Sequence, residues 1–321
     1  MRKDIPYFLR DFLDYLTTIR ALSRTTIEEY YLDLRLFLKF IEYRKSDKDY
    51  DGIEDIDVKN FDLDMLKKVT LIDLHSYLAY RDNSRNNNPV TRARKISSLR
   101  SFYKYMVNIA KLLDYNPALE LESPKLKKRN PVYLTLDEAI KLLETVKNNK
   151  NQLLMKRDFA IILIFLTTGV RLSELSSMNI KSIKDLQFNV IGKGNKERTV
   201  YMTEACKYAI DQYLSVRPKV EDEKALFLST RKTRMSNRAI QHMIDKYLNE
   251  AGFDTSKYST HKLRHTAATL MYKEGVDIRT LQKVLGHTSV ATTQIYTHVE
   301  DEDVKRAIRQ NPLSELKKKD R

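Results

Sequence analysis

Apolar residues recur every three to four positions along most of the chain, and few glycines or prolines interrupt them. This spacing is typical of amphipathic helices and not of half-buried strands. The pattern predicts helices over residues 5–19, 25–40, 71–81, 90–109, 134–146, 155–166, 204–214, 237–250, 262–273, 278–285, 289–298 and 301–309. The fold class that follows is mainly α.

Several of these helices have recognisable ends. Thr25, with Glu28 three residues later, fits a capping box, and Thr70 fits an N-cap for the helix over 71–81. Gly169 and Gly286 each follow a predicted helix, where glycine readily adopts the left-handed C-terminal conformation. We therefore expect one helix to end near Gly169 and another at Gly286.

One segment favours β-structure. Residues 186–191 and 196–201 have the composition of strands, and Gly192-Lys193-Gly194-Asn195 lies between them. We expect an antiparallel hairpin with Lys193 at its tip. The tip lacks the spacing and the Ser/Thr of a P-loop, so it does not indicate nucleotide hydrolysis.

The helical pattern weakens in two places. Residues 46–64 are acidic and polar, which predicts a long connection that faces away from a polyanion. Residues 121–131 are bracketed by prolines and basic in between, which favours a domain boundary. We predict a helical domain over residues 1–118, a basic linker over 119–131 and a second domain over 132–321.

Composition and charge narrow the functional class. The chain has 321 residues, 58 Lys+Arg against 43 Asp+Glu, and a formal net charge of +15. Such a balance is typical of proteins that bind nucleic acid, although ribosomal and membrane-surface proteins share it. Cys206 is the single cysteine, and neither a membrane span nor an apolar signal region is evident. We expect a cytoplasmic, nucleoid-associated protein without membrane insertion.

A basic surface is predicted around the boundary between the domains. The helix over residues 90–109 places Ala93, Ile96, Leu99, Phe102 and Met106 on one stripe. Charged residues occupy its remaining surface, and an ordinary solvated face is the alternative reading. With the linker beside it, we favour DNA contacts by Arg92, Arg94, Lys95, Arg100, Lys125, Lys127, Lys128 and Arg129.

The candidate chemistry is concentrated in the last third of the chain, which carries His261-Lys262-Leu263-Arg264-His265, Leu285-Gly286-His287 and Tyr296. A phenol has an ordinary pKa of ~10 and attacks phosphorus only where positive groups stabilise the developing charge. A metal site is the alternative, but Arg264 between the histidines would repel a cation and the glutamate of the zinc-protease motif is missing. The segment favours phosphodiester chemistry.

Arg171 lies where one predicted helix stops and another starts, after Thr168-Gly169-Val170 and before Leu172-Ser173-Glu174-Leu175. A guanidinium fork at a helix N-terminus favours a phosphate ligand. An ordinary salt bridge to Glu174 is the alternative.

Taken together, these motifs resemble the tyrosine site-specific recombinases of the phage-integrase family, and their local sequences are very close to the Xer branch. The matching positions, in order, are Arg171, Lys193, His261, Arg264, His287 and Tyr296. The resemblance implies an N-terminal four-helix core-binding (SAM-like) domain and a mainly helical catalytic domain with a small antiparallel β-sheet.

The resemblance also implies a role for each matched residue. Tyr296 would attack the scissile phosphate to form a 3′-phosphotyrosyl link, and Arg171 and Arg264 would grip the non-bridging oxygens. Lys193 would protonate the leaving 5′-oxygen, with His261 and His287 assisting. Glu174 would orient the arginine and histidine. No metal or other cofactor is implied.

The implied partners are double-stranded DNA with a specific recombination site, and three further protomers of the same or a second recombinase. Two domains would close around the duplex, and the helix over 301–309 would pack into a neighbour. An activating protein is a further possible partner. The expected task is Xer-type dimer resolution of chromosomes or plasmids. Integration, excision or inversion of a mobile or phase-variable element, or a catalytically silent DNA-binding regulator, are the alternatives.

Overall fold

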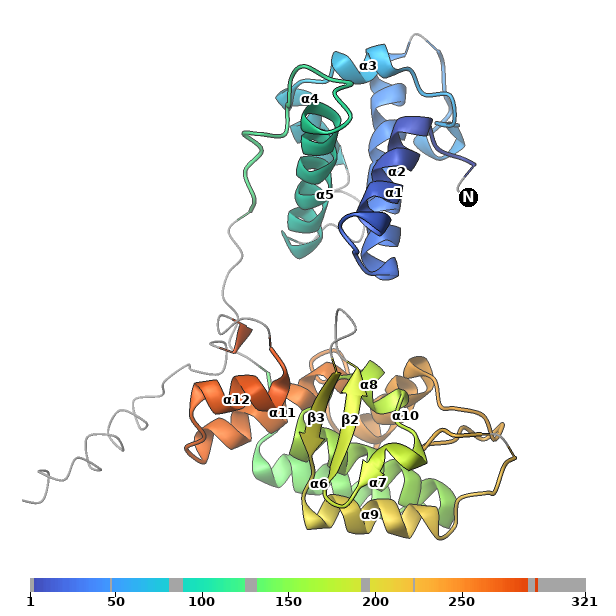
Figure 1. Ribbon diagram of the computed structural model, residues 1–321, viewed down its shortest axis with the longest axis vertical. Helices are drawn as coiled ribbons and strands as arrows, with labels where there is room; N and C mark the ends of the chain where they lie inside the picture. Colours follow the sequence, from blue (N-terminus) through green and yellow to red (C-terminus); the bar gives the residue numbers. More distant parts are fainter. Residues whose placement is uncertain are drawn as a thin grey trace, which may run out of the picture. The chain divides into compact units, whose positions relative to one another are not determined.

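The computed structural model describes residues 3–46, 48–80, 89–124, 132–191, 197–221, 223–287 and 292–293. The chain divides into two compact units, Met1–Lys128 and Arg129–Arg321 (Figure 1). Each unit has its own hydrophobic core. Residues 125–131 of the predicted linker lie outside the described residues.

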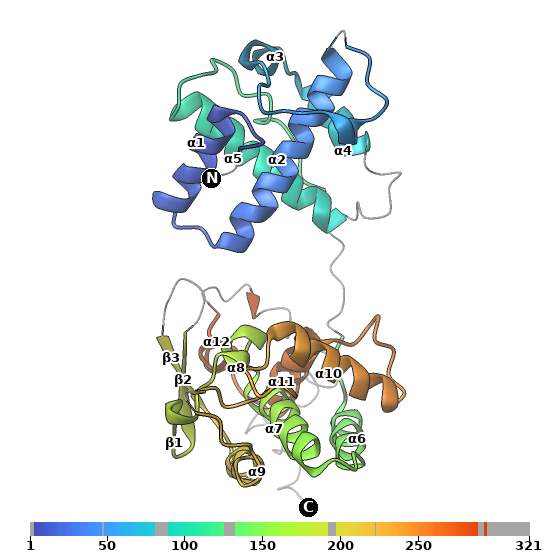
Figure 2. The same ribbon diagram turned by 90° about the vertical axis from the view of Figure 1, so that its right-hand side faces the viewer.

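The first unit is helical. Its described elements are α1 (Tyr7–Thr18), α2 (Arg24–Lys45), a 3₁₀ turn at Ile53–Asp55, α3 (Leu63–Lys67), α4 (Leu71–Tyr80) and α5 (Pro89–Asn108). Helix α2 packs against α1, α4 and α5, and Figure 2 shows it crossing the unit. The four predicted helices are confirmed, whereas α3 was not predicted.

The apolar stripe of α5 lies in the core of this unit, as its spacing predicts. Ile96, Leu99, Phe102 and Met106 are buried. The ring of Phe102 packs edge-on against that of Phe12 on α1, with centroids 5.4 Å apart. Burial of this stripe joins α5 to the first two helices.

Two expectations for this unit need correction. Helix α2 begins one residue before Thr25, and its N-cap is Ser23, whose hydroxyl accepts from the Thr26 amide at 3.3 Å.

The 46–64 segment is not merely a polar connection, because its apolar residues lie in the core. The buried ones are Ile53, Ile56, Val58 and Phe61. Their wide spacing among acidic residues hid them from a search for helical periodicity.

The second unit is mainly helical with a small sheet, as predicted. Its described elements are α6 (Leu136–Lys147), α7 (Gln152–Thr168), α8 (Leu172–Ser176), a 3₁₀ turn at Ile180–Ser182, β1 (Ile183–Lys184), β2 (Gln187–Ile191), β3 (Glu197–Tyr201), α9 (Glu204–Leu214), α10 (Asn237–Glu250), α11 (Thr260–Lys273) and α12 (Ile278–Leu285). The strands form an antiparallel sheet in the order β1-β2-β3, with Phe188 opposite Val200.

Helix α7 is the centre of this unit. It contacts α6, α9 and α11, and Figure 2 shows it between α6 and α9. Its sequence is apolar without interruption from Phe159 to Leu166, and Ile161, Ile162 and Ile164 are fully buried. A helix surrounded by others lacks an exposed polar face, which explains its continuous apolar run.

Several predicted features of the second unit lie outside the described residues. These are the hairpin tip with Lys193, Tyr296, and the helices over 289–298 and 301–309, apart from Thr292 and Thr293. Within the described part of the chain, no helix is both long and apolar enough to cross a bilayer.

Candidate active site

Four of the six residues predicted to be catalytic line one pocket of about 520 Å³ in the second unit. Arg171 is the N-cap of α8, His261 and Arg264 lie on α11, and His287 follows the end of α12. Lys193 and Tyr296 lie outside the described residues. The fold therefore gathers side chains from three separate parts of the sequence.

Two glycines allow the helix ends around the pocket to come close together. Gly169 ends α7 with φ +60°, and a Cβ atom there would lie 2.8 Å from Cδ2 of Leu285. Gly286 ends α12 with φ +62°. The left-handed backbone favours glycine at both positions, and the close approach explains why Gly169 has no room for a side chain. Both predicted helix ends are confirmed.

Three arginines donate to three consecutive carbonyl groups where α12 ends. Arg198 donates to the oxygen of Val284 at 2.7 Å, Arg264 to that of Leu285 at 2.6 Å, and Arg171 to that of Gly286 at 2.9 Å. We call these three carbonyls the α12 carbonyl end. The last carbonyls of a helix lack partners within the helix and carry partial negative charge, so guanidinium groups stabilise them.

Arg264 also joins this end of α12 to the end of α7. Its second terminal nitrogen donates to the carbonyl of Gly169 at 2.6 Å, and only 4% of the residue is exposed. Arg171 keeps 32% of its side chain exposed. The two guanidinium groups are thus held at the pocket by hydrogen bonds to backbone carbonyls.

Glu174 is the carboxylate beneath these arginines, with 1% of its side chain exposed. It accepts from the Arg171 side chain at 2.8 Å, from the Arg171 amide at 2.7 Å and from Arg198 at 2.8 Å. Burial alone would raise the pKa of Glu174, but the hydrogen bonds from Arg198 and the Arg171 amide and the charge of Arg198 hold it below its ordinary value. Arg171 therefore forms the salt bridge to Glu174 and also lines the pocket.

The pKa values of the pocket histidines His261, His265 and His287 are all lowered, which favours the neutral form at pH 7. Burial, followed by the charges of Arg264 and Arg171, lowers the pKa of His287 to about 4. Burial and the neighbouring His261 lower that of His265 to about 4 as well. The Nδ1 atom of His287 lies 3.0 Å from Oγ1 of Thr293, which is fully buried. His265 packs edge-on against His261 and also lines the pocket.

These pKa values predict that stability depends on pH. The unfolded chain binds protons at its histidines near pH 6.5, whereas folded His265 and His287 resist protonation until about pH 4. The free energy of unfolding should therefore fall as the pH drops from 7 toward 4. Chemical unfolding at pH 7.0 and 5.0 measures this difference. We expect it to shrink in His265→Gln and His287→Gln, and an unchanged difference in both variants would contradict the interpretation.

The residues of α5 that were predicted to contact DNA differ in exposure and in their partners. Lys95 is only 6% exposed and lies 5.6 Å from the centre of the Tyr77 ring, so the prediction that it faces DNA was wrong. Arg94 pairs with Asp33 at 2.6 Å and with Glu29 at 2.8 Å. The charged positions of α5 thus include residues that bind the first unit together.

The other predicted DNA contacts divide into two groups. Arg92 is partly exposed, and Arg100 is exposed and donates to the carbonyl of Leu121. Lys125, Lys127, Lys128 and Arg129 lie outside the described residues.

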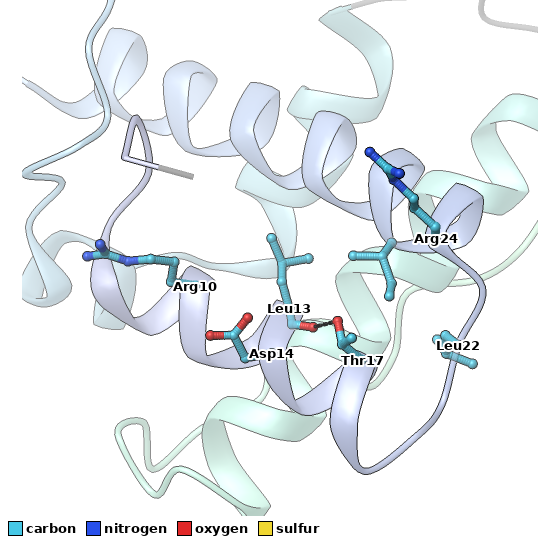
Figure 3. Close-up of a pocket in the computed structure, with 7 residues that line it drawn as sticks. Arg10, Leu13, Asp14, Thr17, Leu22 and Arg24 are labelled. Carbon is cyan, nitrogen blue, oxygen red and sulfur yellow. Dashed lines mark hydrogen bonds between the residues drawn. The ribbon is translucent and has the colours of Figure 1, made fainter. Parts of the chain in front are cut away.

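A pocket of similar size lies between α1 and α2 in the first unit. Figure 3 shows its lining, with Arg10, Asp14 and Thr17 on α1 and Arg24 at the start of α2. The Thr17 hydroxyl donates to its own helix, at the Leu13 carbonyl, over 2.7 Å. None of the residues predicted for catalysis or DNA binding lines this pocket. Among the described residues of both units, no three His, Cys, Asp or Glu side chains gather as metal ligands.

Comparison with known proteins decides the family. The model of the phage integrase family matches residues 132–303, more than half of the chain. The chain belongs to the phage integrase family of tyrosine recombinases. The matched region spans the pocket and all six residues predicted to be catalytic.

Two relatives from bacteria match nearly the whole chain. "Tyrosine recombinase XerC" of Caldanaerobacter subterraneus subsp. tengcongensis is 50% identical over 314 residues, covering 97% of this chain and 88% of the relative. "Tyrosine recombinase XerD" of Oceanobacillus iheyensis is 31% identical over 302 residues, covering 92% and 94%. The similarity thus includes both units of this family member.

Solved structures share the fold. The XerH recombinase bound to difH substrate in a pre-cleavage complex has a TM-score of 0.67 at 24% identity, covering 94% of this chain and 84% of that chain. The integrase of transposon Tn1549 in complex with transposon right end DNA has a TM-score of 0.69 at 16% identity, covering 95% and 99%. At these identities the likeness supports the recombinase fold alone.

Two residues of this site were not predicted from the sequence. Arg198 was read as part of a strand, and Thr293 as part of a helix. Arg198 is separated from Glu174 and Val284 by 24 and 86 residues, and these contacts became visible only in the fold. Arg198 follows Lys196 and Glu197 in the sequence, so no local pattern distinguishes it from its charged neighbours.

Proposed function

We propose that the protein is a site-specific recombinase that cleaves and rejoins duplex DNA with Tyr296 as its nucleophile. The observation that carries the proposal is the pocket lined by Arg171, Arg264 and neutral histidines. Arginines outnumber the single buried carboxylate around it, so its field favours a phosphate. A neutral imidazole has one N–H donor and one acceptor nitrogen, so these histidines can hydrogen-bond a phosphate.

In the proposed step, the phenol of Tyr296 gives up its proton, with His261 and His287 assisting the transfer, and its oxygen attacks the scissile phosphorus. An O–P bond forms to the tyrosine as the bond between phosphorus and the 5′-oxygen breaks. The DNA 3′ end stays linked to the protein as a phosphotyrosyl ester, and the leaving 5′-oxygen takes up a proton. The ester keeps the bond energy, so the reverse attack by a 5′-hydroxyl reseals a strand without ATP.

Arg171 and Arg264 would bind the non-bridging oxygens, whose negative charge increases in the transition state. His287 and His261 would hydrogen-bond the phosphate and assist proton transfer. Glu174 would keep Arg171 in place through the bonds it accepts from that residue. Lys193 would supply the proton for the leaving oxygen.

For assembly, we propose four protomers on two DNA sites, exchanging strands through a four-way junction. A solved lambda integrase tetramer bound to a Holliday junction has a TM-score of 0.63 to this chain at 16% identity, covering 88% of this chain and 76% of that chain. The names of the relatives further support an Xer-type task, which we propose to be dimer resolution, alone or with a second recombinase.

A trapped cleavage reaction tests the activity. The protein is incubated with a duplex that carries its site and a nick near the scissile phosphate, so that the cleaved fragment diffuses away. We expect a protein–DNA adduct that survives SDS. A DNA-binding regulator without cleavage would shift the duplex on a native gel but leave no adduct, and that result would overturn the proposed function.

The role of Lys193 is tested by changing the leaving group. Lys193→Ala should slow cleavage of ordinary DNA by about 10²-fold to 10³-fold, because an alkoxide leaves poorly without a proton. A substrate with sulfur at the bridging 5′ position needs no proton on its leaving group, and the variant should cleave it nearly as fast as the wild type. Lack of rescue would move the acid role to another residue, with Lys196 as the next candidate.

A further inference from the structure

We propose that Arg198 is a positioning residue for the cleavage reaction, holding both Arg171 and the helix end that carries His287. This inference rests on the proposed function. Arg198 lies on β3, keeps 14% of its side chain exposed, and is not among the described residues that line the pocket. It therefore acts through its neighbours.

One set of contacts ties Arg198 to Arg171. Its Nη2 atom donates to Oε2 of Glu174 at 2.8 Å and its Nε atom donates to Oε1 at 3.3 Å. The same carboxylate accepts from Nη1 of Arg171 at 2.8 Å. Because Glu174 is buried between the two guanidinium groups, Arg198 fixes the orientation of the carboxylate that orients Arg171.

The remaining nitrogen ties Arg198 to the helix end before His287. Nη1 donates to the carbonyl of Val284 at 2.7 Å, the first acceptor of the α12 carbonyl end. Arg198 also fills the space beside Gly286, where a Cβ atom would lie 2.7 Å from its Cδ atom. Its three donor nitrogens thus connect a strand, a buried carboxylate and a helix end.

The competing explanation is that Arg198 only forms a structural ion pair with Glu174. Two observations favour a positioning role for Arg198. Both partners of Arg198 lie directly beside groups of the pocket, Glu174 beside Arg171 and Val284 three residues before His287. The charge of Arg198 also contributes, after burial and the charges of Arg264 and Arg171, to the lowered pKa of His287. A merely structural arginine elsewhere in the unit would do neither.

Arg217 is the matched control. It donates to the carbonyls of Ala225 and Leu226 at 2.7 and 3.1 Å, so it also supports backbone carbonyls in the second unit. Neither acceptor lines the pocket. Arg217→Ala and Arg198→Ala therefore both remove a partly buried arginine that donates to backbone carbonyls. Only Arg198 also pairs with the buried carboxylate that supports Arg171 and contacts the helix end before His287.

The experiment measures single-turnover cleavage of the nicked duplex, DNA binding and unfolding for the full-length chain. We expect Arg198→Ala to cleave about 10²-fold more slowly with little change in DNA affinity, since small displacements of reacting groups have effects of this size. Arg198→Lys should recover only part of the rate, because an ammonium lacks the planar fork. Arg217→Ala should stay within about threefold of the wild type.

A double-mutant cycle with Glu174→Gln tests the route to Arg171. If both residues act through one contact, the double variant should cleave about as slowly as the slower single variant. Multiplicative effects would contradict that route. Equal slowing in Arg217→Ala and Arg198→Ala at equal loss of stability would show that Arg198 serves the fold alone and would overturn the proposal.

A readout independent of cleavage separates this inference from the proposed function. If the wild type forms no adduct, the proposed function fails, and NMR titration of His287 still decides the role of Arg198. The pKa of His287 should rise in Arg198→Ala and stay unchanged in Arg217→Ala. An unchanged His287 in both variants would overturn the inference.

Discussion

Arg264→Ala should reduce covalent adduct formation by about 10³-fold, while most of the affinity for DNA remains. The Arg264 guanidinium is far more buried than that of Arg171, with 4% of the residue exposed, and it donates to the carbonyls of Gly169 and Leu285. A phosphate contact from such a fixed donor is strongest in the transition state, whereas binding is spread over many phosphates. Single-turnover cleavage and a salt-dependent binding curve measure the two effects separately.

In Arg264→Ala, a loss of stability must be distinguished from a loss of cleavage activity in the folded protein. Without Arg264, the two carbonyls lose charge-assisted hydrogen bonds worth about 1.5–3 kcal/mol each. Arg171→Ala is the companion variant, because Arg171 is more exposed and its removal should disturb the fold less. Cleavage should fall steeply in both. Equal losses of binding and cleavage would mean that these arginines mainly dock the DNA.

Gly286→Ala should destabilise the second unit by about 2–3 kcal/mol and slow cleavage together with it. The residue has φ +62°, which costs about 1–2 kcal/mol for a residue with a side chain. The new methyl group would also lie 2.7 Å from Cδ and 2.8 Å from Nε of Arg198, so that arginine has to move. Urea unfolding and single-turnover cleavage measure the two effects.

Gly275→Ala provides the control for this prediction. Gly275 has φ +92°, but a Cβ atom there would meet nothing within 4 Å. It should therefore show the backbone effect alone, about 1–2 kcal/mol, with cleavage per folded molecule unchanged. If Gly286→Ala and Gly275→Ala behave alike, the packing of Arg198 against Gly286 has no energetic importance.

Much of this fold could be predicted because its signals are local. Helices such as α9, α10 and α12 have regular apolar spacing, and Gly169 and Gly286 mark helix ends that only glycine adopts easily. The antiparallel hairpin follows from two short strand-like segments around two glycines. The site residues stood out because Arg171, the histidines of α11 and His287 lie in short motifs that resemble those of the family.

Other features depend on contacts distant in sequence and were missed for that reason. The start of helix α8 after Arg171 was predicted, but its extent was not, because five residues are too few for a periodic pattern. Lys95 occupies a charged position of α5, yet the neighbouring ring of Tyr77 buries it. Arg198 has no local motif, because its acceptors come from α8 and α12. Periodicity and local motifs contain no information about such partners.

The central claim is that Tyr296 attacks a phosphate held by Arg171, Arg264 and the histidines of one pocket. Mass spectrometry of the trapped adduct, after digestion of protein and DNA, tests it most directly. We expect a single modified peptide carrying a 3′-linked nucleotide on Tyr296, and no adduct in Tyr296→Phe. A nucleotide on any other residue, or an adduct that persists in Tyr296→Phe, would contradict the claim.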